Sequence, residues 1–241
     1  MYGMYGYGYG YGFDPTIFLV LIGVALSLWA QGRVNSTFSR YSRVRSMTGM
    51  TGAEAARRLL NAQGIYDVTV RPVRGQLTDH YDPRTKTVNL SQSVYGATSV
   101  AAIGVAAHEC GHAMQDNEGY APLRFRSALV PAANFGSKLS WPLILLGLVF
   151  GGLGSPLVEI GILMFSLAVL FQLVTLPVEY NASARAVRLL DSQGILAGEE
   201  VSGTRKVLNA AALTYVAAAA TSILQLLRLL ILFGGRNRRD N

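Results

Sequence analysis

Two histidines and a glutamate near the middle of the chain have the spacing of a metal-dependent hydrolase. His108 and His112 enclose Glu109 in the sequence His-Glu-Cys-Gly-His. On a helix, residues four positions apart lie one turn apart on the same face, so both imidazoles can reach one ion. Glu109 lies beside that face, where its carboxylate can take a proton from a metal-activated water. The motif therefore predicts one Zn²⁺ ion with His108 and His112 as ligands and Glu109 as general base.

The third zinc ligand must come from elsewhere in the chain. A catalytic zinc site has three protein ligands and one open position, and position 118, where an extended motif would place a histidine, is Glu118. Glu179 is the better candidate, because it begins a helix just after a predicted membrane hairpin, on the same side as His108 and His112. Its rival Glu159 lies near the hairpin tip, at the far face of the membrane, where the helix dipole is enough to explain a carboxylate. We therefore expect Glu179 to be the third ligand.

Three other side chains each allow two interpretations. Asp116 follows His112 by four residues and either orients the imidazole or faces solvent. His80 lies in a turn-rich stretch and either stabilises an oxyanion or orders the turn. Tyr215 either polarises the substrate carbonyl or sits at the membrane interface, as tyrosines commonly do. Cys110 faces away from the histidines, and we expect it to be a small buried residue rather than a ligand.

The composition indicates a membrane protein. Of the 241 residues, 51% are hydrophobic and 15% are charged, against about 25% charged in soluble domains. The single cysteine excludes an intrachain disulfide. The net charge of +7 comes from Lys and Arg that flank apolar segments, not from a basic face interleaved with aromatics. We therefore expect a lipid bilayer, and no nucleic acid, as a partner.

Apolar runs and helix breakers divide the chain into segments. They predict a mostly α integral membrane protein, with transmembrane helices and a small α+β zinc-metallopeptidase domain that contains a short β-sheet. The expected boundaries are 1–13 for a Tyr/Gly-rich tail, 14–31 for a transmembrane helix, 32–138 for a cytoplasmic metallopeptidase domain, 139–176 for a transmembrane hairpin, 177–208 for the third-ligand helix and a loop, 209–233 for an apolar helix expected to be transmembrane, and 234–241 for a basic tail.

Local signals predict the elements of the small domain. Thr51 and Glu54 form a capping box that opens a helix ending near Gly64. Alternation predicts strands over 68–73 and 85–90, and the second strand is expected to bind an extended peptide along its edge. A helix follows Ser99 and carries the histidine motif. After the hairpin, an amphipathic helix is expected to begin at Glu179.

The distribution of basic residues predicts the orientation in the membrane. If there are four spans, nearly all Lys and Arg lie near segment ends on one side, and the hairpin tip and the N-terminal tail carry none. By the positive-inside rule that side faces the cytoplasm. The last basic residues, from Arg236 to Arg239, then fall on the wrong side, so either the tail tolerates this or the last segment does not cross.

Several stretches together resemble the family described as putative neutral zinc metallopeptidases of bacterial membranes. The resemblance covers nearly the whole chain, including the N-terminal Tyr/Gly tail. The matching stretches are His-Glu-Cys-Gly-His at 108–112, Leu-Pro-Val-Glu-Tyr-Asn-Ala-Ser at 176–183, Leu-Thr-Asp-His-Tyr-Asp-Pro at 77–83 and Leu-Thr-Tyr-Val-Ala at 213–217.

The resemblance implies a multi-pass zinc endopeptidase of the bacterial cell membrane. In the gluzincin manner, His108, His112 and Glu179 would bind zinc and Glu109 would be the base. The arrangement is also similar to the HtpX/Ste24-like membrane peptidases, whose third-ligand helix has Asp four residues after the Glu, where this chain has Ser183. Substrates are expected to be peptides or proteins, including membrane proteins.

Two alternatives to this function come from other classes. An intramembrane zinc protease would need a spanning helix around His108, and Asp116, Glu118 and Arg124 crowd the motif too closely for that. A non-enzymatic membrane protein with a structural zinc site would need four protein ligands, and a fourth is hard to find in the sequence.

Overall fold

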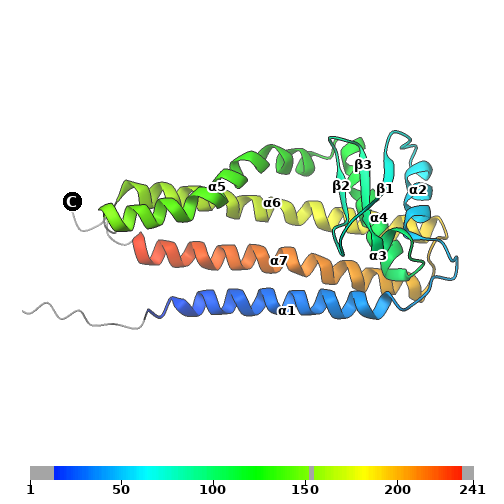
Figure 1. The fold of residues 1–241 in the computed structure, drawn as a ribbon, viewed down its shortest axis with the longest axis horizontal. Coiled ribbons are helices and arrows are strands. Elements are labelled where there is room, and N and C mark those ends of the chain that lie inside the picture. The colour runs from blue at the N-terminus through cyan, green and yellow to red at the C-terminus, as the bar shows by residue number, and fades with distance from the viewer. Residues whose placement is uncertain (1–13, 152–154, 235–241) are drawn as a thin grey trace, which may run out of the picture.

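The computed structural model describes residues 14–151 and 155–234. The expected tail over 1–13, and residues 235–241 of the expected basic tail, lie outside the described residues. The elements, labelled in Figure 1, are α1 (Ile17–Tyr41), α2 (Gly52–Ala62), β1 (Thr69–Val73), β2 (His80–Asp82), β3 (Thr87–Ser91), α3 (Gln92–Tyr95), α4 (Val100–Asn117), α5 (Ala121–Gly151), α6 (Pro156–Ser192) and α7 (Glu199–Phe233).

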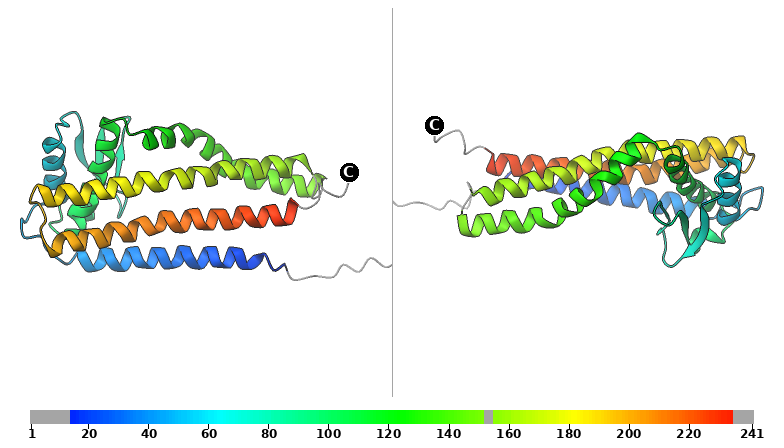
Figure 2. Two further views of the ribbon diagram at one scale, coloured as in Figure 1. Left: turned by 180° about the vertical axis from the view of Figure 1, so that it is seen from behind. Right: turned by 90° about the horizontal axis from the view of Figure 1, so that it is seen from above.

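Four long helices run side by side away from a small domain that holds the sheet. Helix α6 packs against α5 and α7, and α7 packs against α1, as both figures of the whole chain show (Figures 1 and 2). All four are long and apolar enough to cross a membrane. Large apolar side chains on them, such as Leu28 and Phe150, are exposed, as expected for helices surrounded by lipid. The expected fold class, a mostly α membrane protein with a small sheet, is confirmed.

The long helices extend well beyond the apolar runs. Helix α1 continues to Tyr41, and α5 begins at Ala121, upstream of the apolar run that the sequence marks. The prediction that a separate amphipathic helix begins at Glu179 is wrong. Glu179 lies inside α6, which runs through Pro177 without a break. The hydropathy of a sequence changes where a helix passes from lipid into water, but the backbone hydrogen bonds of the helix continue across that boundary.

Small residues and an ion pair between Arg228 and Asp14 help to hold the long helices together. A Cβ added at Gly136 of α5 would lie 2.4 Å from the Met164 carbonyl oxygen of α6, so the two backbones approach as closely as small residues allow. At the end of α7 away from the small domain, Arg228 pairs with Asp14, at 3.0 Å between Nη2 and Oδ2, and also contacts Thr16. This pair explains how an arginine is accommodated in an apolar helix.

The sheet has the strand order β1-β3-β2. Strand β3 pairs with β1 in parallel and with β2 in antiparallel orientation. The sequence marks β1 and β3, but β2 lies in the stretch expected to be a turn. The prediction that strand 85–90 offers a free edge to a peptide is wrong, because β3 is the central strand and both of its edges are paired.

The small domain packs its own core against the membrane helices. The capping box of Thr51 and Glu54 opens α2 as predicted, and the Ser99 hydroxyl caps α4. Leu59 of α2, Val88 of β3, Ile103 of α4 and Leu190 of α6 belong to one buried cluster. Helix α4 is therefore fixed between the sheet side of the domain and α6, and its orientation sets the position of the histidine motif.

Candidate metal centre

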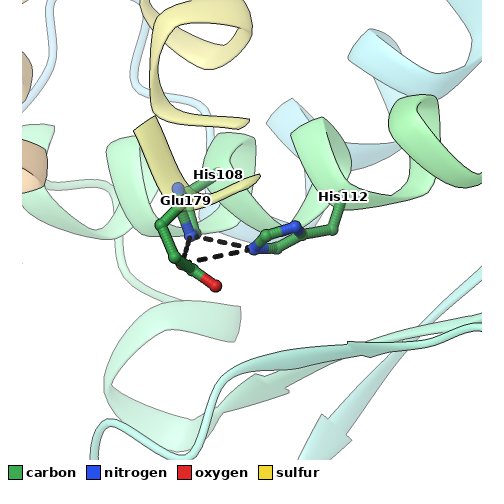
Figure 3. Close-up of side chains that lie close together, drawn as sticks. All are labelled: His108, His112 and Glu179. Carbon is green, nitrogen blue, oxygen red and sulfur yellow. Dashed lines mark hydrogen bonds and ion pairs between the residues drawn. The ribbon is translucent and has the colours of Figure 1, made fainter. Parts of the chain in front are cut away.

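His108, His112 and Glu179 converge from two helices. The histidines lie one turn apart on α4, and the glutamate reaches them from α6 (Figure 3). The Nε2 atoms of the two histidines are 3.2 Å apart. The Glu179 Oε2 atom lies 3.3 Å from His108 Nε2 and 3.5 Å from His112 Nε2. The three donor atoms therefore form a nearly equilateral triangle.

The size of this triangle fits a zinc ion. Ligand bonds of about 2.0–2.1 Å in a tetrahedral site place neighbouring donor atoms about 3.3–3.4 Å apart, close to the separations observed here. Glu179 Oε2 is also buried and makes no hydrogen bond with any described residue. A buried carboxylate oxygen without a donor is costly unless a cation holds it. The donor set, its spacing and this orphaned oxygen all fit zinc.

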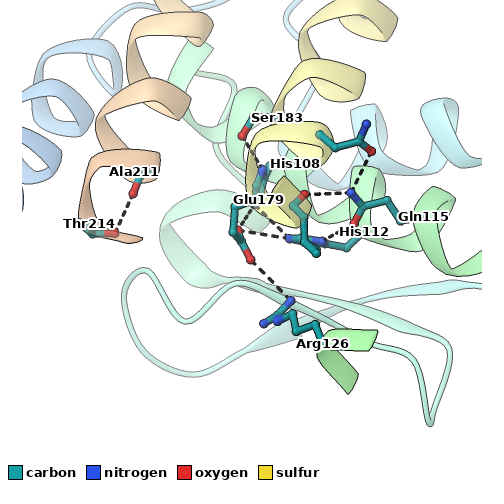
Figure 4. A network of polar contacts seen from close by, with 10 residues as sticks. His108, His112, Gln115, Arg126, Glu179, Ser183, Ala211 and Thr214 are labelled. Atoms are coloured by element: carbon teal, nitrogen blue, oxygen red, sulfur yellow. Dashed lines mark hydrogen bonds and ion pairs between the residues drawn. The ribbon is translucent and has the colours of Figure 1, made fainter. Parts of the chain in front are cut away.

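The Nδ1 atoms of both histidines are within hydrogen-bond distance of other side chains, and their Nε2 atoms face each other and Glu179. His112 Nδ1 donates to Gln115 Oε1 at 3.0 Å, and His108 Nδ1 lies 3.1 Å from the Ser183 hydroxyl oxygen (Figure 4). Hydrogen bonds at Nδ1 select the tautomer with a free Nε2 lone pair and fix the ring orientation. Neither Gln115 nor Ser183 was expected in this role.

Gln115 connects its histidine to α6. It is fully buried, and its Nε2 donates to the Val178 carbonyl and to Asn181 Oδ1, both at 2.9 Å. Asn181 Oδ1 also accepts from Arg185 Nε at 2.7 Å, and Arg185 pairs with Glu118. This chain of hydrogen bonds links the end of α4 to α6, the helix that carries Glu179.

Gly111, inside the histidine motif, allows α6 to approach α4. A Cβ at this position would lie 2.5 Å from the Ala182 carbonyl oxygen of α6, closer than any side chain tolerates. The glycine therefore permits the backbone contact that brings Glu179 and Ser183 within reach of the two histidines. The neighbouring Cys110 points away from them, is fully buried, and has a thiol 3.6 Å from the Ala56 carbonyl oxygen. Burial raises the pKa of this thiol.

Glu109 borders a small cavity beside the donor triangle. The cavity holds about 160 Å³, and Glu179 and Tyr215 also line it. Most of its other walls are apolar. Glu109 is 7% exposed and its carboxylate makes no hydrogen bond or ion pair with the described residues, so it is available to a bound molecule. Asp79 closes the cavity on the sheet side, where it accepts from the Ser91 backbone N–H at 2.7 Å, and burial raises its pKa.

Arg126 of α5 is a further charged group at the centre. Its Nη1 atom lies 3.5 Å from Glu179 Oε1, the carboxylate oxygen that faces away from the histidines. Its side chain is 29% exposed, so one side of the guanidinium is open to solvent. In the sequence Arg126 is one of many basic residues near segment ends, and only the approach of α5 to α6 distinguishes it.

Of the three remaining candidate residues, one lies at the cavity and two lie away from the donor atoms. Tyr215 lines the cavity. Asp116 makes its contacts with Tyr81 and Lys86, both at 2.8 Å, and none with His112. His80 is exposed at the start of β2, where Nδ1 lies 2.9 Å from the Thr78 carbonyl oxygen and Nε2 lies 3.2 Å from the Asn89 amide nitrogen. Neither Asp116 nor His80 belongs to the group of donor atoms.

Replacing Gln115 by leucine is expected to weaken zinc binding by about 10- to 100-fold, the usual effect of removing a hydrogen-bond partner of a ligand. Asp116→Asn is the matched control, since that residue is adjacent but contacts Tyr81 and Lys86 instead of the histidine. Zinc affinity can be measured in detergent by competition with a chromophoric chelator. Equal affinities for the Gln115 variant and the parent would show that this hydrogen bond does not support the ligand.

Comparison with known proteins shows similarity to a zinc peptidase family and to a membrane protease. The family model described as "Putative neutral zinc metallopeptidase" matches residues 16–234. The chain is 51% identical over 224 residues to the "Putative membrane protease YugP" of Bacillus subtilis (strain 168), covering 93% of this chain and 98% of that protein. No solved structure matches the chain.

Proposed function

Because the chain belongs to the putative neutral zinc metallopeptidase family, we propose that it is a membrane-anchored zinc endopeptidase. His108, His112 and Glu179 bind the metal, and Glu109 is the general base. The observation that carries this proposal is the triangle of donor atoms, whose separations of 3.2–3.5 Å suit one tetrahedral zinc ion. Glu109 follows His108 directly on α4 and borders the adjacent cavity.

The roles of the residues follow from their positions. A zinc ion held by the three groups would lower the pKa of a water in its open position and polarise the scissile carbonyl. The Glu109 carboxylate accepts one proton from the attacking water as its oxygen forms the new bond to the carbonyl carbon. The same carboxyl then donates that proton to the leaving amine nitrogen when the C–N bond breaks. Glu109 thereby returns to its ionised form.

Tyr215 is placed to assist at the substrate carbonyl. It lines the same cavity as Glu109, from the opposite helix α7, and a phenol hydroxyl can donate to a developing oxyanion. The other walls include Val34, Val105 and Leu208, so we expect an apolar substrate side chain in the cavity. Its volume of about 160 Å³ admits one side chain of moderate size. Membrane proteins are rich in apolar side chains of this size.

The geometry favours an enzyme over a structural zinc site. A structural site is closed by four protein ligands, whereas the group of donor atoms in the described part of the chain contains three. A cavity lined by the Glu109 carboxylate lies beside these three groups. An intramembrane site is also disfavoured, because α4, which carries both histidines, is not among the helices apolar enough to span.

Purification in detergent, metal analysis and a peptide-library digest test the proposal. We expect about one zinc per chain and cleavage of apolar peptides. A chelator should abolish the cleavage, and added zinc should restore it. Cleavage that persists after the zinc has been removed would refute the proposal, as would a zinc-loaded protein that cleaves no peptide.

We also propose that the small domain and the metal centre face the cytoplasm. Arg33, Arg40, Arg43 and Arg45 follow the apolar part of α1 at the end beside the small domain, whereas residues 14–30 contain no Lys or Arg. This asymmetry satisfies the positive-inside rule.

Cysteine labelling in intact cells checks this orientation. Met47 is 89% exposed between α1 and α2, Pro15 is exposed at the other end of α1, and the native Cys110 is fully buried. A membrane-impermeant maleimide should modify the Pro15→Cys variant in intact cells and the Met47→Cys variant only after permeabilisation. Modification of Met47→Cys in intact cells would reverse the proposed orientation.

A further inference from the structure

A second, larger cavity lies where α1, α6 and α7 leave the small domain. This basic cavity has a volume of about 670 Å³, within the usual range for small-molecule sites. Its lining is rich in cations and hydroxyl groups and contains no acidic residue. The polar and charged side chains that line it are Arg33, Ser36, Thr37, Arg40, Tyr41, Tyr180, Lys206 and Asn209.

The three cations of this cavity have no anionic partner in the described part of the chain. Among residues 14–151 and 155–234, no carboxylate lies within ion-pair distance of Arg33, Arg40 or Lys206. Arg40 stacks over the Tyr41 ring at 5.6 Å, which orients the guanidinium without neutralising it. Three uncompensated positive charges around one cavity, with hydroxyls and an amide between them, suit an anion with several oxygens, such as a phosphate group.

The basic cavity is separate from the metal centre. Residues three and four apart on a helix share a face, and α7 uses two such sets on roughly opposite faces. The basic cavity and the cavity beside the metal centre therefore share no lining residue. The α7 residues beside the metal centre are Leu208, Ala211, Ala212 and Tyr215, and those in the basic cavity are Lys206, Asn209, Ala210 and Leu213.

The surface below the basic cavity is apolar and exposed. On α7 the face of Lys206 continues through Leu213 to Val216, Ile223 and Leu227, and the last three are 37–45% exposed. On α1, Trp29 lies one turn before Arg33 and is 56% exposed, the position that tryptophan favours at a membrane interface. A cavity in this position suits a lipid headgroup, and the apolar surface next to it suits acyl chains.

From this arrangement we propose that the basic cavity binds the phosphate headgroup of an anionic phospholipid. Arg33, Arg40 and Lys206 contact the phosphate, and the acyl chains lie along the apolar face of α7 and beside Trp29. Basic pockets between membrane helices are suited to such headgroups. The proposal does not depend on the proteolytic activity, because the two cavities occupy different faces of α7.

Quenching of Trp29 by brominated lipids tests this proposal. The chain has two tryptophans, so a Trp141→Phe background leaves Trp29 as the only reporter. In phosphatidylcholine nanodiscs, we expect half-maximal quenching at an about tenfold lower fraction of brominated phosphatidylglycerol than of brominated phosphatidylcholine. The double variant Arg40→Gln, Lys206→Gln should reduce this preference to within about twofold.

Two further arms distinguish the ligand source. The matched control Arg43→Gln, Arg188→Gln also removes two exposed cations, but neither residue lines the cavity. It should keep most of the preference, and an equal loss in both double variants would mean that general surface charge attracts the lipid. Inorganic phosphate, compared with chloride at equal ionic strength, should leave the quenching unchanged. Displacement by phosphate would identify a soluble phosphate ligand and overturn the assignment to a lipid.

Discussion

Glu109→Gln is expected to lower the rate of peptide cleavage by about 10²- to 10⁴-fold, the range that a positioned general base contributes, and to leave zinc bound. The amide keeps the size of the side chain but cannot accept the proton of the attacking water. The donor atoms of His108, His112 and Glu179 do not include this carboxylate, so the zinc content should stay near one per chain. Metal analysis and the peptide digest on the same preparation measure both quantities.

A matched glutamate variant distinguishes the loss of the general base from a non-specific effect of replacing Glu by Gln. Glu199 is exposed in the first turn of α7, outside both cavities, and Glu199→Gln makes the same chemical change there. It should cleave at the parental rate. If Glu109→Gln lost its zinc, the residue would be supporting the metal rather than acting as the base. If it kept both zinc and full activity, another group would have to take the proton.

The local elements of the site follow from short-range patterns. The capping box at Thr51 and Glu54, the Ser99 cap and the helical spacing of His108 and His112 each depend on residues within one turn. Such patterns are visible in sequence because the interacting groups are close along the chain. The same spacing places Gln115 three residues after His112, a signal that could have identified it as a ligand partner.

Other features depend on how distant segments pack and carry no local signal. Ser183 lies 3.1 Å from His108 although 75 residues separate them, and that contact exists because Gly111 lets α6 approach α4. The central position of β3 also depends on pairing with β1, which lies before the intervening β2 in the chain. The alternation of β3 indicates a strand but not its neighbours.

Helix ends were the least predictable part of the fold for a physical reason. The sequence marks where apolar residues stop, yet α1, α5, α6 and α7 all continue into the region beside the small domain. This continuation places the site, because Glu179 lies in the part of α6 that extends past its apolar run. Arg33, Arg40 and Lys206, the cations of the basic cavity, also lie in such extensions of α1 and α7.

Glu179→Ala is expected to lower zinc affinity by about 100-fold or more, since even hydrogen-bond partners of ligands contribute 10- to 100-fold. Without it, two histidines would hold the ion, whereas catalytic zinc sites have three protein ligands. The truncation should not unfold the protein, because Oε2 has no hydrogen bond among the described residues and Oε1 faces Arg126, whose side chain is partly exposed to solvent. Chelator competition gives the affinity, and circular dichroism checks the helix content.

Glu159→Ala is the matched control on the same helix. Glu159 lies in the first turn of α6, and the 20 residues between positions 159 and 179 correspond to about 30 Å along the axis. Its removal should leave zinc affinity unchanged, because no side chain spans that distance to the histidines. Parental zinc affinity in Glu179→Ala, together with a loss in Glu159→Ala, would place the metal at the opposite end of the helices. The three-ligand centre and the role of Glu109 would then both have to be abandoned.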